Sequence, residues 1–444
     1  MKQTFILGLA AISMLTFASC EKEAPAGTPQ TDNVVEGIPT TATINLANSP
    51  STMADNDASG TPTESKISDA TLFVFNNADV LESIVQFDAA AITAKSVTFE
   101  TTTGAKRLFA CINMNDKIAA YNFKTVTTAA NPNEITTLDQ FKKTQQTITF
   151  AEITAANNFW MTNLEKQPAQ VIVGNIAASN VFTVTVGRAC AKVSLAVGSG
   201  VAGSGGTLSD ISYKVKQNPN KMYLMPVYEG ANYTGAQLLT PYYPTATQGT
   251  YLDGASITLT NPNEAKATYM TENSNQSIMP KKVTYLEVSG IWRPNLDQTL
   301  NPDGSPAATQ LAKGADFWRV AKYDKPATAT DKKIIGYKPG CYNAVPQAGQ
   351  VAATEGAVKY EGGKCFYAIY VQDKNAGTDK ELPLRYTIKR NTFFKVVISS
   401  ISGPGAGTQE GVIPDPDKPV EQSIEMTVNI SVANWTIADL NAGI

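Results

Sequence analysis

Apolar and polar residues alternate along many short stretches of this chain, which is the pattern of β-strands with one buried face. The longest unbroken alternation ends at Val432 and places apolar side chains at every second position: Ile424, Met426, Val428, Ile430 and Val432. It follows a run of Gly, Pro and acidic residues, Gly403 to Val420, that is typical of a tether. A well-patterned strand after a tether can complete its own domain or a neighbouring molecule, and we favour the neighbour.

The rest of the chain predicts further strands separated by turn residues, and hence an all-β fold. The predicted strands are Thr41–Leu46, Ala70–Phe75, Val80–Phe87, Ser96–Glu100, Lys106–Met114, Phe159–Thr162, Val171–Val173, Val181–Val186, Ala189–Val197, Lys281–Trp292, Cys365–Gln372, Pro383–Lys389 and Phe393–Ile401. Helical spacing occurs at Thr137 to Gln146. The stretch from Pro294 to Gly356 reads as a loop with Trp318 as its anchor.

Composition excludes several classes of function. With 444 residues, two domains are the natural expectation. Charged residues make up 17% and the formal net charge is −3, so there is no electrostatic case for binding nucleic acid. The chain has no histidine, which removes His-based acid–base catalysis and imidazole metal sites. We therefore expect no enzyme activity, no catalytic residues, no cofactor and no metal site.

The first residues form an export signal. Lys2 precedes an apolar stretch, Phe5 to Phe17, that is too short to span a membrane. The following Ala-Ser-Cys resembles a bacterial lipobox, which implies lipid attachment at Cys20; the alternative is an ordinary signal peptide cut near Ala18. Glu21-Lys22-Glu23 is similar to the surface-export signal of Bacteroidia lipoproteins.

Four further cysteines contain no C-x-x-C pair, so the zinc-ribbon and thioredoxin interpretations fail. Cys111 and Cys190 lie in apolar runs and are expected to be buried core residues. Cys341 and Cys365 are able to pair, but four cysteines allow three connectivities and the sequence does not choose among them.

Several segments together resemble the Bacteroidia fimbrillins, the type V pilins. The segments that carry the resemblance are Lys106–Asn113, Arg188–Val193, Arg390–Ile398 with Ser402–Gly405, Pro414–Asp417 and Val428–Trp435. They occur in the family's order across nearly the whole chain. The resemblance implies two tandem transthyretin-like β-sandwich domains with a C-terminal donor strand.

The resemblance also implies a division of the chain. It gives a signal peptide over 1–19, a propeptide with the first strand over 20–66, sandwich domains over 67–187 and 188–402, and a tether with the donor strand over 403–444. A trypsin-like protease would remove the first strand, and the groove would accept the C-terminal strand of the next subunit. Between the first and second strands Lys66 is the only lysine, and no arginine precedes Arg107, so we expect cleavage after Lys66.

The expected function is that of a structural subunit of a surface fimbria, exported through the periplasm to the outer membrane and supporting adhesion and biofilm. Its expected partners are further copies of itself, other fimbrial subunits, the outer membrane through Cys20, and ligands on host or bacterial surfaces. Two alternatives stay open. One is an anchor or accessory subunit that keeps its lipid. The other is a monomeric glycan-binding surface lipoprotein that uses the Tyr-rich stretch from Tyr223 to Tyr251.

Overall fold

The computed structural model is dominated by strands, and the predicted all-β architecture is confirmed. It describes residues 34–48, 60–125, 134–164, 169–199, 203–226, 251–273, 278–374, 385–413, 419–420 and 425–434. No helix within these ranges has the length and apolarity needed to cross a bilayer.

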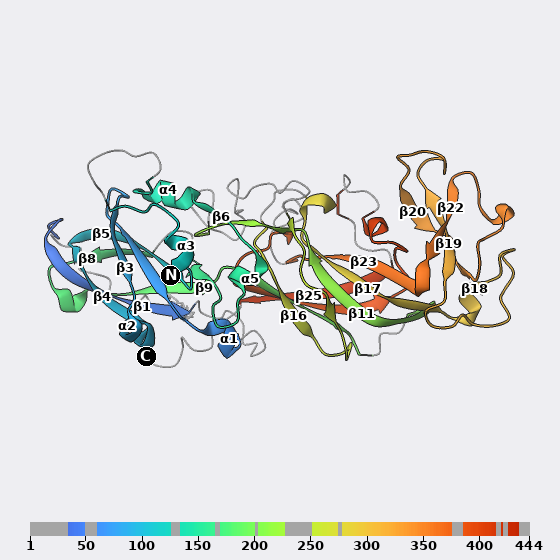
Figure 1. Ribbon diagram of the computed structural model, residues 1–444, viewed down its shortest axis with the longest axis horizontal. Coiled ribbons are helices and arrows are strands. Elements are labelled where there is room, and N and C mark those ends of the chain that lie inside the picture. Colours follow the sequence, from blue (N-terminus) through green and yellow to red (C-terminus); the bar gives the residue numbers. More distant parts are fainter. Residues whose placement is uncertain are drawn as a thin grey trace, which may run out of the picture.

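One large sheet forms the N-terminal unit, at the left of Figure 1. Its eight strands run in the order β3-β2-β5-β7-β9-β1-β4, with β8 beside β5. Their bounds are β1 Pro39–Asn48, β2 Ala70–Phe75, β3 Leu81–Gln86, β4 Ser96–Thr102, β5 Gly104–Ile112, β7 Met161–Asn163, β8 Ala169–Val173 and β9 Val181–Arg188. The strand β2 lies between β3 and β5 and is buried along its whole length, which explains why apolar residues occupy both of its faces.

Short helices complete this unit. They are α1 Pro62–Ser65, α2 Ala89–Ala94, α3 Asn115–Ile118, α4 Leu138–Lys143 and α5 Phe150–Ile153. Helix α4 confirms the predicted helical spacing, and its start is fixed by a capping box between Thr137 and Gln140. Its Phe141 contacts the rings of Phe73 and Phe109 with centroids 4.9 and 4.6 Å away, so α4 packs on the sheet.

Two four-stranded sheets form the C-terminal unit in the middle of Figure 1. One has the order β16-β10-β24-β25 and the other β15-β11-β17-β23. The bounds are β10 Ala191–Val197, β11 Gly206–Lys216, β15 Ile257–Thr258, β16 Lys266–Met270, β17 Tyr285–Pro294, β23 Lys364–Tyr370, β24 Thr392–Ile401 and β25 Met426–Asn434. Val193 and Val396 of the first sheet share a core with Tyr213 and Val288 of the second, so the two sheets pack as a β-sandwich.

A further sheet projects beyond the sandwich at the right of Figure 1. It contains β18 Thr299–Leu300, β19 Phe317–Tyr323, β20 Ile334–Tyr337, β21 Cys341–Tyr342 and β22 Glu355–Tyr360. The loop prediction for Pro294 to Gly356 is therefore wrong. The buried anchor is Phe317, stacked on Tyr360 with ring centroids 4.5 Å apart, whereas Trp318 is only partly buried. Three of these strands, β18, β20 and β21, are only two to four residues long, and the two longer ones, β19 and β22, carry charged residues between the apolar ones.

Contacts between the two units are polar as well as apolar. β13 Lys221–Tyr223 pairs with β6 Gln145–Thr147 across the two units, whereas β12 Asn218–Pro219 pairs with β14 Tyr251–Leu252 within the C-terminal unit. Buried Arg390 lies 2.5 Å from Glu272 and donates to Thr162 Oγ1 at 2.6 Å. Because Thr162 belongs to the N-terminal unit, this buried network ties the two units together.

The remaining short elements are 3-10 turns, η2 Ala177–Ser179, η3 Pro280–Lys282, η4 Leu296–Gln298, η5 Ala348–Gln350, η6 Glu361–Gly363 and η8 Glu410–Val412. A strand over Pro383–Lys389 is wrong for the described residues 385–389, where Ile388 makes a single bridge to Asn273. After this segment Asn391 adopts a positive φ of 57°, and β24 starts at the next residue.

Candidate functional site

The C-terminal strand lies in the sheet of its own chain. β25 pairs antiparallel with β24, from Met426 opposite Ile401 to Asn434 opposite Thr392. Met426 and Val428 are buried, while Ile430 and Val432 are partly buried against the core. The predicted alternation of inward and outward side chains is therefore present over the described residues. Ile424 lies outside them, and the donor role of the strand stays a prediction.

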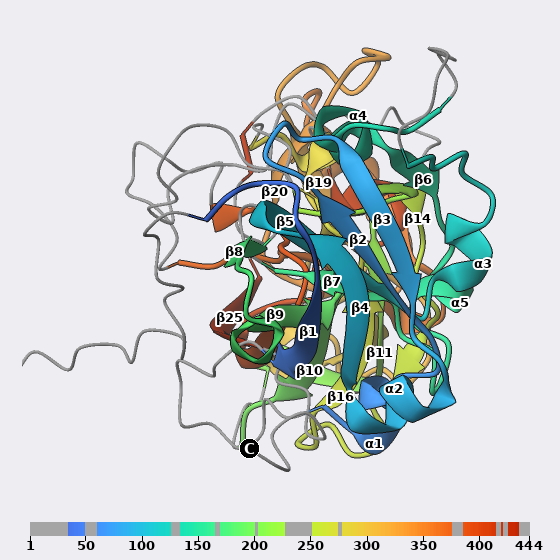
Figure 2. The same ribbon diagram turned by 90° about the vertical axis from the view of Figure 1, so that its left-hand side faces the viewer.

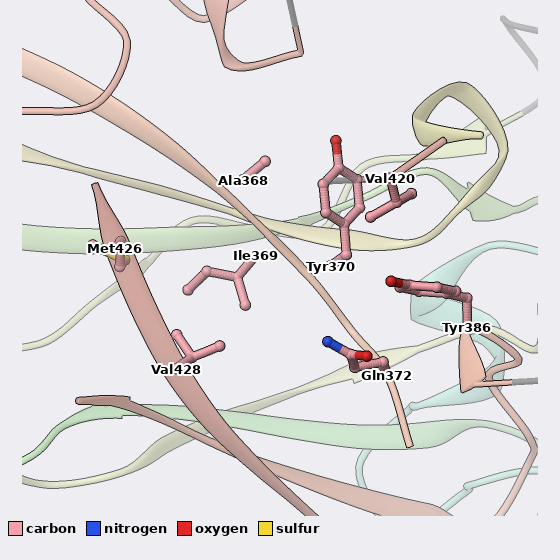
Figure 3. A pocket seen from close by; sticks show the side chains of 8 residues that line it. All are labelled: Ala368, Ile369, Tyr370, Gln372, Tyr386, Val420, Met426 and Val428. Atoms are coloured by element: carbon pink, nitrogen blue, oxygen red, sulfur yellow. The ribbon is translucent and has the colours of Figure 1, made fainter. Parts of the chain in front are cut away.

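β25 forms one wall of a small apolar pocket, shown in Figure 3. The pocket is lined by Ala368, Ile369, Tyr370, Gln372, Tyr386, Val420, Met426 and Val428. The side chain of Val428 projects from the strand toward Ile369 of β23. Departure of β25 would therefore open the pocket and expose apolar surface of the C-terminal unit.

An ion pair anchors the start of β25. The Glu425 carboxylate accepts hydrogen bonds from both terminal nitrogens of Arg319, at 2.8 and 3.0 Å, and from the backbone N–H of Gly405 at 2.6 Å. Arg319 comes from β19 of the projecting sheet and stacks on the ring of Tyr337, 4.3 Å from its centroid. Burial alone would lower the pKa of Arg319, but the Glu425 charge raises it above its ordinary value. Sequence reasoning missed this contact because Glu425 reads as an outward polar residue of the alternating strand.

The segment predicted as a tether is docked on its own unit over its described part. Gly403 and Gly405 accept hydrogen bonds from the hydroxyls of Tyr367 and Tyr360, each at 2.6 Å. Farther along, Val420 donates its backbone N–H to the carbonyl of Ile278 at 2.7 Å. For β25 to leave this unit, either the chain must change direction after the docked residues, or these residues must detach.

The first strand occupies an interior position, unlike β25. β1 pairs antiparallel with β4 on one side and parallel with β9 on the other, as Figure 2 shows. Its inward side chains Ala42, Ile44 and Leu46 are buried, and Ile44 is 0% exposed. Removal of β1 would leave a groove with a hydrogen-bonding edge on each side.

A buried asparagine at the end of the turn η2, just before β9, holds β1. Asn180, 2% exposed, donates from Nδ2 to the carbonyl of Thr41 at 3.0 Å and to that of Gly174 at 2.9 Å. Its Oδ1 accepts from the N–H of Gly174 at 2.9 Å, and its carbonyl accepts from the N–H of Thr43 at 2.7 Å. No periodic sequence signal marks such a residue, so sequence reasoning missed it as well.

The predicted processing residue follows α1 directly. The Lys66 side chain is exposed, but its carbonyl accepts from Asn113 Nδ2 at 2.9 Å and the two preceding residues, Glu64 and Ser65, are buried. Nothing in the described structure bears on whether a protease cuts there. Lys66 lies on the surface within a backbone that is held on both sides.

α1 is held by side chains from both units, Arg188 of β9 and, from the C-terminal unit, Lys192 and Tyr269. Glu64 accepts from Lys192 Nζ at 2.8 Å and from Tyr269 Oη at 2.7 Å, while Arg188 Nε donates to the Glu64 carbonyl at 2.9 Å. Burial raises the pKa of Glu64, but the hydrogen bonds from Lys192, the Thr61 backbone and Tyr269 outweigh it, so the pKa lies below its ordinary value. α1 thus connects the segment before Lys66 to the second unit.

The four described cysteines are free and buried, so neither Cys341 nor Cys365 is in a disulfide. Burial raises the pKa of Cys190, Cys341 and Cys365 to about 12 each, which makes these thiols inert at neutral pH. Cys20 and the signal segment lie outside the described residues, as does most of the Tyr-rich stretch. Within the described ranges no group of three or more Cys, Asp or Glu side chains is arranged to hold a metal ion.

Two family models match the chain over separate parts of its length. Residues 40–223 match the model described as major fimbrial subunit protein (FimA). Residues 358–441 match the model described as major fimbrial subunit protein type IV, fimbrillin, C-terminal. The chain belongs to the fimbrillin family. The FimA match begins within β1 and the fimbrillin C-terminal match includes β24 and β25, so both strands of interest lie in the family-defining parts. These are families of fimbrial structural subunits rather than enzymes.

Solved structures with a similar course of the chain include a fimbrilin (FimA) of Porphyromonas gingivalis W83, 17% identical with a TM-score of 0.46. The match covers 90% of this fimbrillin and 98% of that chain. The tip fimbrial protein Mfa3 of the same species, with a C-terminal truncation, is 11% identical with a TM-score of 0.43, covering 89% and 100% of the two chains. These values are too low to assign a role within a fimbria. No curated protein sequence matches the chain.

Proposed function

We propose that this fimbrillin is a shaft subunit that polymerises by strand exchange, in which β25 of one subunit replaces β1 of the next. The observation that carries the proposal is the difference in pairing between the two strands. β1 has seven residue pairs with β4 and six with β9, whereas β25 has nine pairs with β24 and no described partner on its other edge. A strand that moves from the edge position into the groove gains a second hydrogen-bonded ladder.

The gain has a definite size. Each intramolecular hydrogen bond contributes about 0.5–1.5 kcal/mol net, so about six additional ladder bonds contribute roughly 3–9 kcal/mol. Ile430 and Val432, partly buried at the edge, would also become fully buried, as Ile44 is now. Ordering of the linker and loss of the Glu425–Arg319 ion pair offset part of this gain.

Filling of the groove by β1 explains why processing would precede assembly. As long as β1 is in place, both edges of the groove are paired and no strand can enter. Cleavage after Lys66 would detach β1 and α1 from the remainder of the chain. Because α1 is held through Glu64 and Arg188, we propose that cleavage requires local opening of α1 and that release of the cut segment follows. N-terminal sequencing of mature subunits should give Ile67; a different first residue would move the processing site.

Assembly at the cell surface would begin with export as a lipoprotein anchored through Cys20. Because donor strand and acceptor groove lie on different units, contacts between subunits would be head to tail and would propagate into a filament. The partners in this proposal are further copies of the chain and other fimbrial subunits. Adhesion through surface ligands would be a property of the assembled fimbria.

The test compares the intact chain with a version truncated after Val420 and a control truncated after Asn434, each expressed in the native host. Fimbriae sheared from cells are run unheated in detergent, where strand-exchanged multimers persist. Intact chain and control should give a ladder of multimers, and the Val420 truncation should give monomer. A ladder that survives the Val420 truncation would assign the donor to another segment.

A second candidate, an anchor subunit that keeps β1 and its lipid, is favoured by the contacts that hold α1 and β25 in place in the single chain. Mass spectrometry of subunits from outer membranes discriminates the two. An anchor retains a lipidated Cys20 at its N-terminus, whereas a shaft subunit begins after the removed strand.

A further inference from the structure

We infer that Asn180 anchors the strand that enters the N-terminal groove, by holding one backbone carbonyl of that strand. This inference rests on the proposed strand exchange and goes beyond it by naming the residue of the acceptor and the residue of the donor that meet. The ligand of Asn180 would be the carbonyl of Thr427 from a second copy of the chain.

The side chain of Asn180 is prepared for this role by contacts that do not involve β1. Gly174 supplies both an N–H to Oδ1 and a carbonyl to Nδ2, each at 2.9 Å, which fixes the plane of the amide. A primary amide carries two N–H donors, and the second one points at the Thr41 carbonyl 3.0 Å away. Both contacts with Gly174 would persist after β1 leaves, so this donor would stay aimed into the groove.

With the groove filled, Asn180 is only 2% exposed, so a strand that enters without offering a carbonyl would bury this donor unpaired. A buried donor without a partner costs free energy, which an incoming strand recovers if it places a carbonyl at the same point. A backbone carbonyl occurs at every residue, so the contact accepts any sequence. Because a shift of two residues brings the next carbonyl to the same point, the contact anchors the strand without choosing its register.

The side chains of the groove select one register. In a strand running in the direction of β1, Val428, Ile430 and Val432 would replace Ala42, Ile44 and Leu46. In this register Ile430 takes the place of Ile44, which is 0% exposed, so the volume and shape at that buried position are preserved. The carbonyl of Thr427 then meets Asn180.

The same register brings Asn429 into the place of Thr43. Thr43 lies opposite Thr98 of β4, with the two hydroxyl oxygens 2.8 Å apart on the exposed face of the sheet. Directly opposed strand residues have Cβ atoms close enough for a disulfide. Thr98 and Asn429 are therefore a pair that reports the register.

The experiment uses the full chain in the native host with two substitutions at a time. Thr98→Cys is combined with Asn429→Cys for the inferred register, or with Thr427→Cys or Ser431→Cys for the registers two residues away. Sheared fimbriae are oxidised with diamide, which converts the opposed thiols to a disulfide, and are run denatured without reductant. The four described native cysteines are buried and give little background.

The Thr98–Asn429 pair should give covalent multimers at least fivefold above either shifted pair. Adding Asn180→Ala should lower the yield of assembled subunits about tenfold, the effect of one hydrogen bond to a buried donor, and should leave the preference for the Thr98–Asn429 pair unchanged. Asn180→Asp, which keeps the acceptor for Gly174 but loses the donor, should do the same if the alanine variant does not fold. Asn163→Ala is the matched control, because Asn163 is buried in the same sheet and bonds β5 rather than β1.

Three results would overturn the inference: dominance of a shifted pair, an unchanged yield of assembled subunits in both Asn180 variants, or an equal loss of yield in the Asn163 variant. These leave strand exchange intact, since covalent multimers still form. Absence of covalent multimers with all three pairs would instead show that the C-terminal strand does not lie beside β4, and the proposed function would fail with the inference.

Discussion

Replacement of Ile430 by aspartate distinguishes the two positions considered for the C-terminal strand, the edge of its own sheet and the groove of a neighbouring subunit. In its own sheet Ile430 is partly buried at an edge strand, so a carboxylate there reaches solvent. In the groove every inward residue is enclosed, as Ile44 is at 0% exposed. The same substitution is therefore tolerated in the monomer and costly in the polymer.

The difference in cost can be estimated from burial. Loss of a fully buried isoleucine costs about 1.5–3 kcal/mol, and desolvation of a carboxylate adds several kcal/mol. A total of about 5 kcal/mol would weaken the subunit contact by more than about a thousandfold. At the edge position the partial loss of burial costs about 1–2 kcal/mol, a shift of a few degrees in the unfolding temperature.

The matched control is Asn429→Asp, which adds the same charge on the adjacent residue, whose side chain is exposed in the monomer and would face outward in the groove. Both variants are expressed in the native host, and monomer content and multimer length are measured. Ile430→Asp should accumulate as folded monomer, and Asn429→Asp should give multimers of normal length. Normal multimers from Ile430→Asp would show that Ile430 does not enter a closed groove.

Further predictions concern the contacts that hold the chain before assembly. Glu425→Gln should weaken the pairing of β25 with β24 by about 2–4 kcal/mol, because Arg319 keeps its charge without an ionic partner. Hydrogen exchange of the β24–β25 amides should therefore accelerate. The control Asp139→Asn, which breaks an exposed ion pair, should leave this exchange rate unchanged. Unchanged protection in Glu425→Gln would refute the anchoring role. Glu64→Gln should raise the rate at which trypsin cuts after Lys66 about tenfold or more, because cleavage follows opening of α1. An unchanged rate would mean that α1 does not limit the access of the protease to Lys66. Because the pKa of Glu64 lies below its ordinary value of 4.5, its contribution to the free energy of unfolding is complete above that pH and is lost as the pH falls through the lower folded-state pKa. The difference in unfolding free energy between wild type and Glu64→Gln should therefore be constant near neutral pH and shrink in acid, and a difference that grows in acid would contradict this. Cys111, Cys190, Cys341 and Cys365 should resist iodoacetamide in the native protein at pH 8 and react fully after denaturation, and rapid native labelling of any one would contradict its burial.

Much of the fold follows from side-chain alternation, because a sheet with one buried face imposes a period of two. Ala70–Phe75 has the bounds that its apolar run predicts, and the inward positions of β25 agree with the pattern from Met426 to Val432. The projecting sheet was not predicted, because most of its strands are too short to show such a period. Three of its strands are two to four residues long, and the stacking of Phe317 on Tyr360 joins two strands far apart in sequence, which no local period reveals.

The polar contacts of the candidate site could not be predicted from the sequence for a different reason. Asn180 is a single polar residue before a strand, and Glu425 fits the outward half of an alternating pattern, so neither departs from what a solvated residue looks like. Their importance comes from partners distant in sequence, Thr41 and Arg319. The docking of the segment after Gly403 is likewise set by tyrosine hydroxyls of other strands, which its Gly- and Pro-rich composition does not indicate.

Strand exchange is tested most directly by determining the structure of assembled fimbriae by electron cryo-microscopy and reading the side chains between β4 and β9. Exchange predicts that this position holds residues 426–432 of the neighbouring subunit, with β24 of each donor freed from its own C-terminal strand. Density for Ala42, Ile44 and Leu46 of the same chain in that position, with β25 still paired to β24, would contradict it.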